Sequence, residues 1–378
     1  MQVQHLAKGL IEATRHAKHS FREEWAEQLV ARYTAFPGKP IIHLDDLEDS
    51  VLVALDAAAI PMLRRYYEGL DKPGRYLWGT FRNIVNFTKG RGLRASRLGK
   101  WKEFANLEPG LPIGSLESHI SFMRISDGKF VRTINAPKLP MNLATVEGAK
   151  ILGYRGDVYH RNSAFTNENP TLHEDYRRCI RSVVGDITIT QTEIESGGFV
   201  SKRYIRTNVG RFVTRLSSIA GLDNTIDQPH ANNPAPLWLI RLAEEIVSAY
   251  LAALWDAEGS VNAHDIKLSQ AVSLESLPTA IDVPHWPGTL RPRDLEPQCR
   301  AYVEQKPPLL LVSSAILLFS LGIASRLQPI GLSRSGSDFQ VYWQLRIHKI
   351  AYARIFRDKI HLLSEHKQRA LINWLEAT

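Results

Sequence analysis

The order of helical and alternating segments after residue 137 constrains the fold more than any other feature of the sequence. Between Leu143 and Ile219 the hydrophobic pattern predicts a helix, two short strands, a helix, two strands and a last helix. The same order begins again at Leu237 and continues to the end of the chain. Alternating strands have one apolar face, so the helices of each series must cover one face of a sheet. The sequence therefore predicts an α+β protein with an internal duplication.

Changes in composition divide the chain into successive parts. These are a basic, mainly helical N-terminal domain at residues 1–110, a connecting segment at 111–138, a first repeat at 139–222, a linker at 223–236, and a second repeat at 237–378 with a proline-rich insertion at 274–305. Within these parts, we expect residues 45–69 to be helical and residues 120–134 to form a pair of strands.

The segment from Pro307 to Ser325 is uncharged and strongly apolar. Two prolines at its start, four serines and a length near the lower limit for a membrane span favour a buried helix. A membrane-associated protein built around this segment is the alternative. The residues after Met1 lack the pattern of a secretory signal, and two cysteines are too few for a disulfide scaffold. We therefore expect an intracellular protein, cytoplasmic or organellar, with no membrane partner.

Basic residues exceed acidic residues by 47 to 39, which favours a polyanionic partner. Residues 72–102 contain nine basic residues and no acidic residue, with aromatic residues between them. Basic side chains can neutralise phosphates while aromatic faces stack on bases. The alternative is a solvated basic face whose aromatic residues lie in a core. The candidate DNA contacts in this segment are Lys89, Arg91, Arg94, Arg97 and Lys100.

A short motif ends the first predicted helix of the second series. It reads Leu251-Ala252-Ala253-Leu254-Trp255-Asp256-Ala257-Glu258-Gly259 and resembles the signature of the LAGLIDADG homing endonucleases. Glu258 stands at the eighth position and keeps the carboxylate of the signature's aspartate. An alanine-rich core helix with acidic residues at its end would give the same pattern, but the twofold order of elements favours the family.

The first series carries a weaker form of the same pattern. From Leu139 to Asp157 the chain is similar to the family's Leu-Pro lead-in, helix and terminal Gly-Asp. The helix ends one residue early, Arg155 takes a position that normally faces the partner helix, and Val158 replaces the usual glycine.

The resemblance implies a fold, a reaction and a set of site residues. The fold would be two pseudo-symmetric αββαββα repeats forming a DNA-binding saddle, in a single-chain monomer. Asp157 and Glu258 would hold Mg²⁺ for double-strand phosphodiester hydrolysis at a long recognition site, and Lys349 would support the transition-state charge. Asp256 points to another side of the helix, so a structural role is expected. The alternative on the same fold is a non-cleaving DNA-binding regulator or an RNA-binding intron maturase.

The alternating strands supply further candidate DNA contacts. Arginine, lysine and glutamine can read base edges, although the same residues on an outer strand face are often only solubilising. The candidates are Lys202, Arg203, Arg206, Lys267, Gln270, Arg326, Arg334 and Arg346. No glycine-rich phosphate loop is present, so we expect no nucleotide cofactor.

Overall fold

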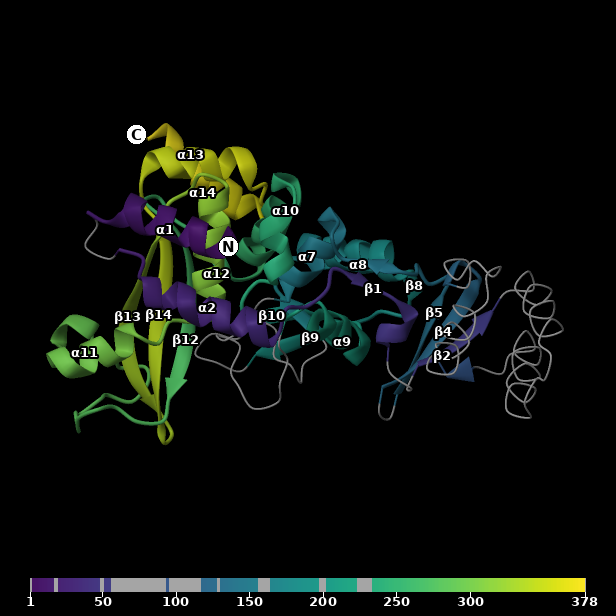
Figure 1. The fold of residues 1–378 in the computed structure, drawn as a ribbon, viewed down its shortest axis with the longest axis horizontal. Helices are drawn as coiled ribbons and strands as arrows, with labels where there is room; N and C mark the ends of the chain where they lie inside the picture. Colours follow the sequence, from purple (N-terminus) through teal and green to yellow (C-terminus); the bar gives the residue numbers. More distant parts are fainter. Residues whose placement is uncertain are drawn as a thin grey trace.

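The computed structural model of the chain describes residues 2–16, 20–47, 51–55, 93–94, 117–127, 130–155, 164–196, 202–222 and 233–377. This part of the chain is a mixed α+β structure whose strands form antiparallel sheets. Helices α1 (Gln2–Thr14) and α2 (Glu23–Ala35) lie beside the C-terminal sheet, so the two ends of the sequence share one part of the molecule (Figure 1).

The C-terminal series forms a four-stranded sheet in the order β11-β12-β14-β13. Along the sequence, one helix precedes the first two strands, an apolar helix lies between these strands and the last two, and two more helices follow. These elements are α10 (Glu244–Glu258), β11 (Gly259–Val261), β12 (Ile266–Leu274), α12 (Leu309–Ser320), β13 (Arg326–Ser335), β14 (Asp338–Ile347), α13 (Ile350–Lys359) and α14 (Glu365–Glu376). The first helix expected in the second series is divided, because a 3-10 helix, η3 (Leu237–Arg241), precedes α10.

Strand β14 has one buried and one outward face. Val341, Trp343 and Leu345 are buried in the core, whereas Tyr342 and the alternate residues on either side are partly exposed. Helix α12 packs against the buried face and is itself apolar on all sides, as a fully enclosed helix must be. The prediction of a buried helix is therefore confirmed. Among the described residues, we find no helix with the length and apolarity that crossing a membrane requires.

The first series has a related arrangement. Its elements are α7 (Val146–Tyr154), β7 (Ala164–Asn167), α8 (Pro170–Val184), β9 (Thr190–Ser196), β10 (Lys202–Asn208) and α9 (Arg211–Ile219). The strands pair in the order β7-β10-β9, all antiparallel. This order matches β12-β14-β13 in the C-terminal sheet. Of the two short strands expected after the first helix of this series, the second lies within the described residues and the first lies outside them.

The N-terminal helices complete the core of the C-terminal unit. Both α1 and α2 pack on α12, and the Trp25 ring meets the Trp343 ring edge-on at 5.7 Å. The Trp25 indole also donates a hydrogen bond to the carbonyl of Glu304 at 3.0 Å. An apolar helix such as α12 needs cover on the side away from its sheet, and α1 and α2 supply it. Helices α1 and α2 are thus part of the core of the C-terminal unit.

A separate five-stranded sheet lies at the far end of the molecule (Figure 1). It contains β3 (Leu93–Arg94), β2 (Val51–Leu55), β4 (Ile120–Asp127), β5 (Phe130–Asn135) and β8 (Asp186–Ile187), in that order. The pair of strands expected at 120–134 is confirmed. The helix expected across 51–55 is wrong, because these residues pair with β4, and alternating Val and Leu suit a strand. A short pair, β1 (Ile41–Ile42) with β6 (Met141–Asn142), links the N-terminal segment to the start of the first series.

Helices α7 and α10 make the closest contact between the two series. A Cβ atom added to Gly153 would lie 2.4 Å from the carbonyl oxygen of Tyr250 and 2.9 Å from Cβ of Ala253. Because the first of these neighbours is backbone, it cannot move aside without shifting a helix. The absence of a side chain at Gly153 therefore allows α7 and α10 to approach.

We expect Gly153→Ala to lower the free energy of unfolding by about 1–3 kcal/mol, the usual cost of overpacking, despite the better helix propensity of alanine. Gly331→Ala in β13 is the matched control, because the nearest atoms to its added Cβ lie at 3.5 Å. Urea unfolding of both variants measures the difference. Equal stability of the two variants would show that the contact between α7 and α10 is loose.

Candidate functional site

Glu258 is the last residue of α10 and is exposed. It borders a cavity of about 490 Å³ at the point where the two series meet. The walls come from the end of β7, from Tyr204 in β10, from the end of α10 and the adjoining β11, and from the start of α14. Glu168, also exposed, lies on the opposite series and lines the same cavity. Carboxylates from both series therefore border one hollow.

Asp256 has a structural role, as its place on the helix suggested. Its carboxylate is buried and accepts hydrogen bonds from the backbone N–H of Leu363 at 2.7 Å and of Ser364 at 3.0 Å. Burial raises the pKa of Asp256, while these two donors act in the opposite direction. Since Ser364 is the residue before α14, Asp256 fixes the start of α14 against the end of α10.

Lys367 is a buried cation at the same helix end. Its Nζ donates to the carbonyl oxygens of Trp255 at 2.8 Å and Asp256 at 2.7 Å, which are carbonyls of the last turn of α10. Burial lowers the pKa of Lys367, and the nearby carboxylates of Asp256, Glu258 and Glu168 act to raise it. A cation at a helix C-terminus offsets the negative end of the helix dipole. Lys367 therefore reduces the electrostatic cost of placing Glu258 there.

His173 holds the strand end that carries Glu168. It is fully buried, with Nδ1 at 2.8 Å from Oγ1 of Thr207 and Nε2 at 3.0 Å from the carbonyl oxygen of Asn167. Burial lowers the pKa of His173, so the neutral ring is favoured. This histidine ties α8 to β10 and to the end of β7, and it fixes one wall of the cavity.

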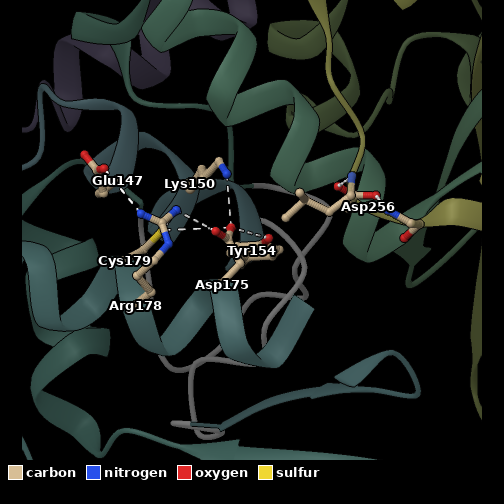
Figure 2. A network of polar contacts seen from close by, with 9 residues as sticks. Glu147, Lys150, Tyr154, Asp175, Arg178, Cys179 and Asp256 are labelled. Atoms are coloured by element: carbon tan, nitrogen blue, oxygen red, sulfur yellow. Dashed lines mark hydrogen bonds and ion pairs between the residues drawn. The ribbon is translucent and has the colours of Figure 1, made fainter. Parts of the chain in front are cut away.

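A polar network anchors α7 to α8 on the far side of the helix pair. Asp175 accepts hydrogen bonds from the Tyr154 hydroxyl at 2.8 Å, from Lys150 at 3.1 Å and from Arg178 at 2.6 Å, as Figure 2 shows. Burial acts to raise the pKa of Asp175, but these donors, Arg178 first, hold it below its usual range. Burial also raises the pKa of the Cys179 thiol to about 12, so the thiol stays protonated and unreactive.

The cavity beside Glu258 offers oxygen ligands. Glu258 and Glu168 supply carboxylates, and hard oxygen donors of this kind suit Mg²⁺, which is commonly held by one or two carboxylates together with waters and phosphates. This donor set fits a partly hydrated magnesium ion. No cluster of three or more His, Cys, Asp or Glu side chains suited to a metal occurs within the described part of the chain.

The outward face of the C-terminal sheet carries three cations in one cross-strand row. Lys267 of β12 is paired with Arg346 of β14, which is paired with Arg326 of β13. The Nε atom of Arg346 lies 2.6 Å from Oδ2 of Asp265, a buried residue in the turn before β12. The next row on this face is also polar and consists of Ser269, Gln344 and Gln328. We call Lys267, Arg346 and Arg326 the basic row.

Other predicted contacts lie elsewhere. Gln270 and Arg334 fall on the opposite face from the basic row, because strand residues alternate and a bulge shifts β13 between Pro329 and Gly331. In the first sheet, Arg206 shares a row with Thr166 and Thr192, and Arg203 lies on the other face, 3.5 Å from Glu195.

Lys349 precedes α13 and is exposed. It does not line the cavity beside Glu258; together with Arg326 and Arg346 it surrounds His348, whose pKa is lowered first by burial and then by these cations.

The side chains of seven predicted site residues are not among those that the structure describes. Asp157, Lys89, Arg91, Arg97 and Lys100 lie outside the described residues. Arg94 in β3 and Lys202 in β10 are placed by their backbone alone. Sequence patterns predict no role for Lys367, Glu168 or Asp265. Lys367 and Glu168 depend on contacts between distant segments, and no local pattern marks them.

No protein-family model matches the sequence, and no curated protein is significantly similar to it.

We expect Lys367→Met to lower the free energy of unfolding by about 1–3 kcal/mol, because it removes the buried ammonium group that donates to the carbonyls of Trp255 and Asp256. Lys359→Met is the matched control. Lys359 pairs with Glu244 at the other end of α10, at 2.9 Å, and this pair is partly exposed, so its loss should cost less than about 1 kcal/mol. Thermal or urea unfolding compares them. A Lys367 variant as stable as the Lys359 variant would contradict the assigned capping role.

Proposed function

We propose that the chain is a nucleic-acid-binding protein of the LAGLIDADG type and acts as a metal-dependent DNA endonuclease. In this proposal, residues 139–222 and 237–378 are two pseudo-symmetric αββαββα repeats, and α7 and α10 are the helices at their pseudo-dyad. The close approach of Gly153 to Tyr250 and Ala253 carries the proposal, because it places the two motif helices in direct contact. The shared strand order, β7-β10-β9 and β12-β14-β13, supports it.

The outward faces of the two sheets would form the DNA-binding saddle. The basic row on the C-terminal sheet, with its neighbouring row of serine and glutamine, combines phosphate-neutralising and base-reading side chains on one surface. Arg206 supplies a cation on the first sheet. The partner would be double-stranded DNA, bound by a monomer inside the cell.

The proposed chemistry is centred on Glu258. The carboxylate would hold Mg²⁺ at the end of α10, with Glu168 near enough to line the same cavity. The bound ion would supply activation of a water and stabilisation of the leaving oxygen during phosphodiester hydrolysis. Lys367 and Asp256 hold the helix end that presents Glu258. Asp157 remains the proposed ligand from the first repeat, and Lys349 the proposed support of the transition-state charge.

One asymmetry favours a second candidate function, a non-cleaving DNA-binding regulator or an RNA-binding maturase. Gly153 and Ala253 can be taken as equivalent because they meet at the helix contact. Asp157 then lies four residues after Gly153, whereas Glu258 lies five residues after Ala253. The aligned position for a second carboxylate is then Val158. Helix α7 also ends at Tyr154, whereas α10 continues to Glu258. A site with one carboxylate out of register could bind DNA and lack cleavage.

We expect Glu258→Gln to abolish Mg²⁺-dependent cleavage of host-locus DNA and to leave DNA binding within about twofold, because the charge needed for the ion is lost while the sheets are unchanged. Glu244→Gln, at the other end of α10, should keep full activity. Gel analysis of cleaved DNA and anisotropy of a labelled duplex measure the two properties.

Cleavage that persists in the Glu258 variant would reject the catalytic assignment. Salt-sensitive binding by the unchanged protein with no nicking in Mg²⁺ or Mn²⁺ would select the non-cleaving function instead.

We expect Arg326→Gln to weaken duplex binding and to reduce the slope of log affinity against log salt by about one, the effect of losing one phosphate contact. Arg203→Gln removes an equally charged side chain that is 79% exposed, but on the opposite strand face of the other sheet, and should change neither quantity. Anisotropy titrations at several salt concentrations give both slopes. If the two variants have the same duplex affinity and the same salt slope, the outward face is not the DNA contact.

A further inference from the structure

The proline-rich insertion runs along the outer edge of β13. Leu290 and Leu332 exchange two backbone hydrogen bonds, each of 2.8 Å, so this part of the insertion extends the sheet. A Cβ atom on Gly331 would lie 3.5 Å from Cβ of Thr289 and 3.6 Å from the Tyr342 ring. The insertion therefore reaches onto the outward face of the sheet beside Tyr342.

Trp286 stands in this insertion and is the most exposed of the large hydrophobic side chains in the described ranges, at 63%. Its backbone is fixed, because its N–H donates to the carbonyl of Arg334 at 3.2 Å and the N–H of Gly288 donates to the carbonyl of His285 at 2.8 Å. The arrangement holds a large apolar ring in solvent on an ordered segment. Tryptophan is enriched at interfaces, because it combines a large apolar ring with a polar N–H group.

Tyr342 connects Trp286 to the basic row. The Trp286 and Tyr342 rings lie 5.6 Å apart with a tilt of 40°, and the Tyr342 hydroxyl lies 3.0 Å from Oγ of Ser333. Tyr342 shares the outward face with Gln344 and Arg346. Four residues of strand separate Tyr342 from Arg346, about 13 Å at about 3.3 Å per residue. A nucleic acid held by the basic row would therefore extend to Trp286.

We propose that Trp286, supported by Tyr342, is a stacking site for an unpaired nucleobase of a nucleic acid bound along the basic row. This inference rests on the proposed nucleic-acid binding. A base inside a duplex has both faces covered by its neighbours, whereas a bulged or unpaired base has a free face that an aromatic ring can cover. The cations of the basic row complement the phosphates of the same strand. DNA and RNA can both present such a base.

The test compares the full chain with Trp286→Ala and Trp286→Phe. The probes are a fully paired DNA duplex, the same duplex with one bulged nucleotide, and the RNA form of each. Ile372→Ala, which removes another exposed apolar side chain from α14, is the control. Anisotropy titrations at two ionic strengths give affinities and salt slopes. Trp286 is exposed, so its variants should fold, and Trp286→Phe keeps an aromatic face.

We expect the unchanged protein to prefer the bulged duplex, and Trp286→Ala to lose roughly tenfold in affinity for it with no change for the paired duplex. Trp286→Phe should retain most of the preference, and all salt slopes should agree because no charge changes. The nucleic acid that shows the loss identifies the source of the base.

Equal affinity of Trp286→Ala and the unchanged protein for every bulged probe would overturn the stacking site while leaving the proposed binding function intact. An equal loss on paired and bulged duplexes would also overturn it, because Trp286 would then contact paired DNA. Failure of the unchanged protein to bind any probe would instead refute the proposed function, and the stacking site with it.

Discussion

The close approach of α7 and α10 is the contact on which the rest of the molecule depends. Gly153 lacks the side chain that would meet the backbone of Tyr250, and Ala253 presents only a methyl group. Because α7 and α10 are in direct contact, the end of β7 in the first series and the end of α10 in the second series border one cavity. The network around Asp175 holds α7 against α8, and Lys367 holds the end of α10 against α14.

The end of α10 combines acidic and basic groups, each of which would be unfavourable there without the other. Glu258 stands at the negative end of a helix, where a carboxylate is disfavoured, and buried Asp256 adds a second acid. Lys367 and the N–H groups at the start of α14 compensate both. A divalent cation beside Glu258 would reduce the remaining repulsion. In the proposed function, this helix end would hold the ion beside a DNA phosphate.

Local patterns in the sequence were sufficient for most elements of the two series. Alternation in β14 and the apolar run of α12 determine their structures almost independently of context. The prediction failed at Val51–Leu55, where a short apolar run suits a helix or a strand and pairing with β4 decides between them. Gln270 was expected among the DNA contacts, but it lies on the face of β12 opposite the basic row. The sequence of a strand does not show which face is inward, because the distant helices that cover the strand decide it. Lys367 and Trp286 gain their significance from contacts over long sequence separations, which composition and spacing do not encode.

Native-state hydrogen exchange of the unbound protein tests most directly whether α7 and α10 form one structural unit. Amides in the cores of the two helices should then exchange with the same opening free energy and the same denaturant dependence, because one helix cannot open without exposing the other. The contradicting result is exchange from α7 at a clearly lower free energy while α10 remains protected. The two series would then be independent units, and a shared site at their junction would have no structural basis.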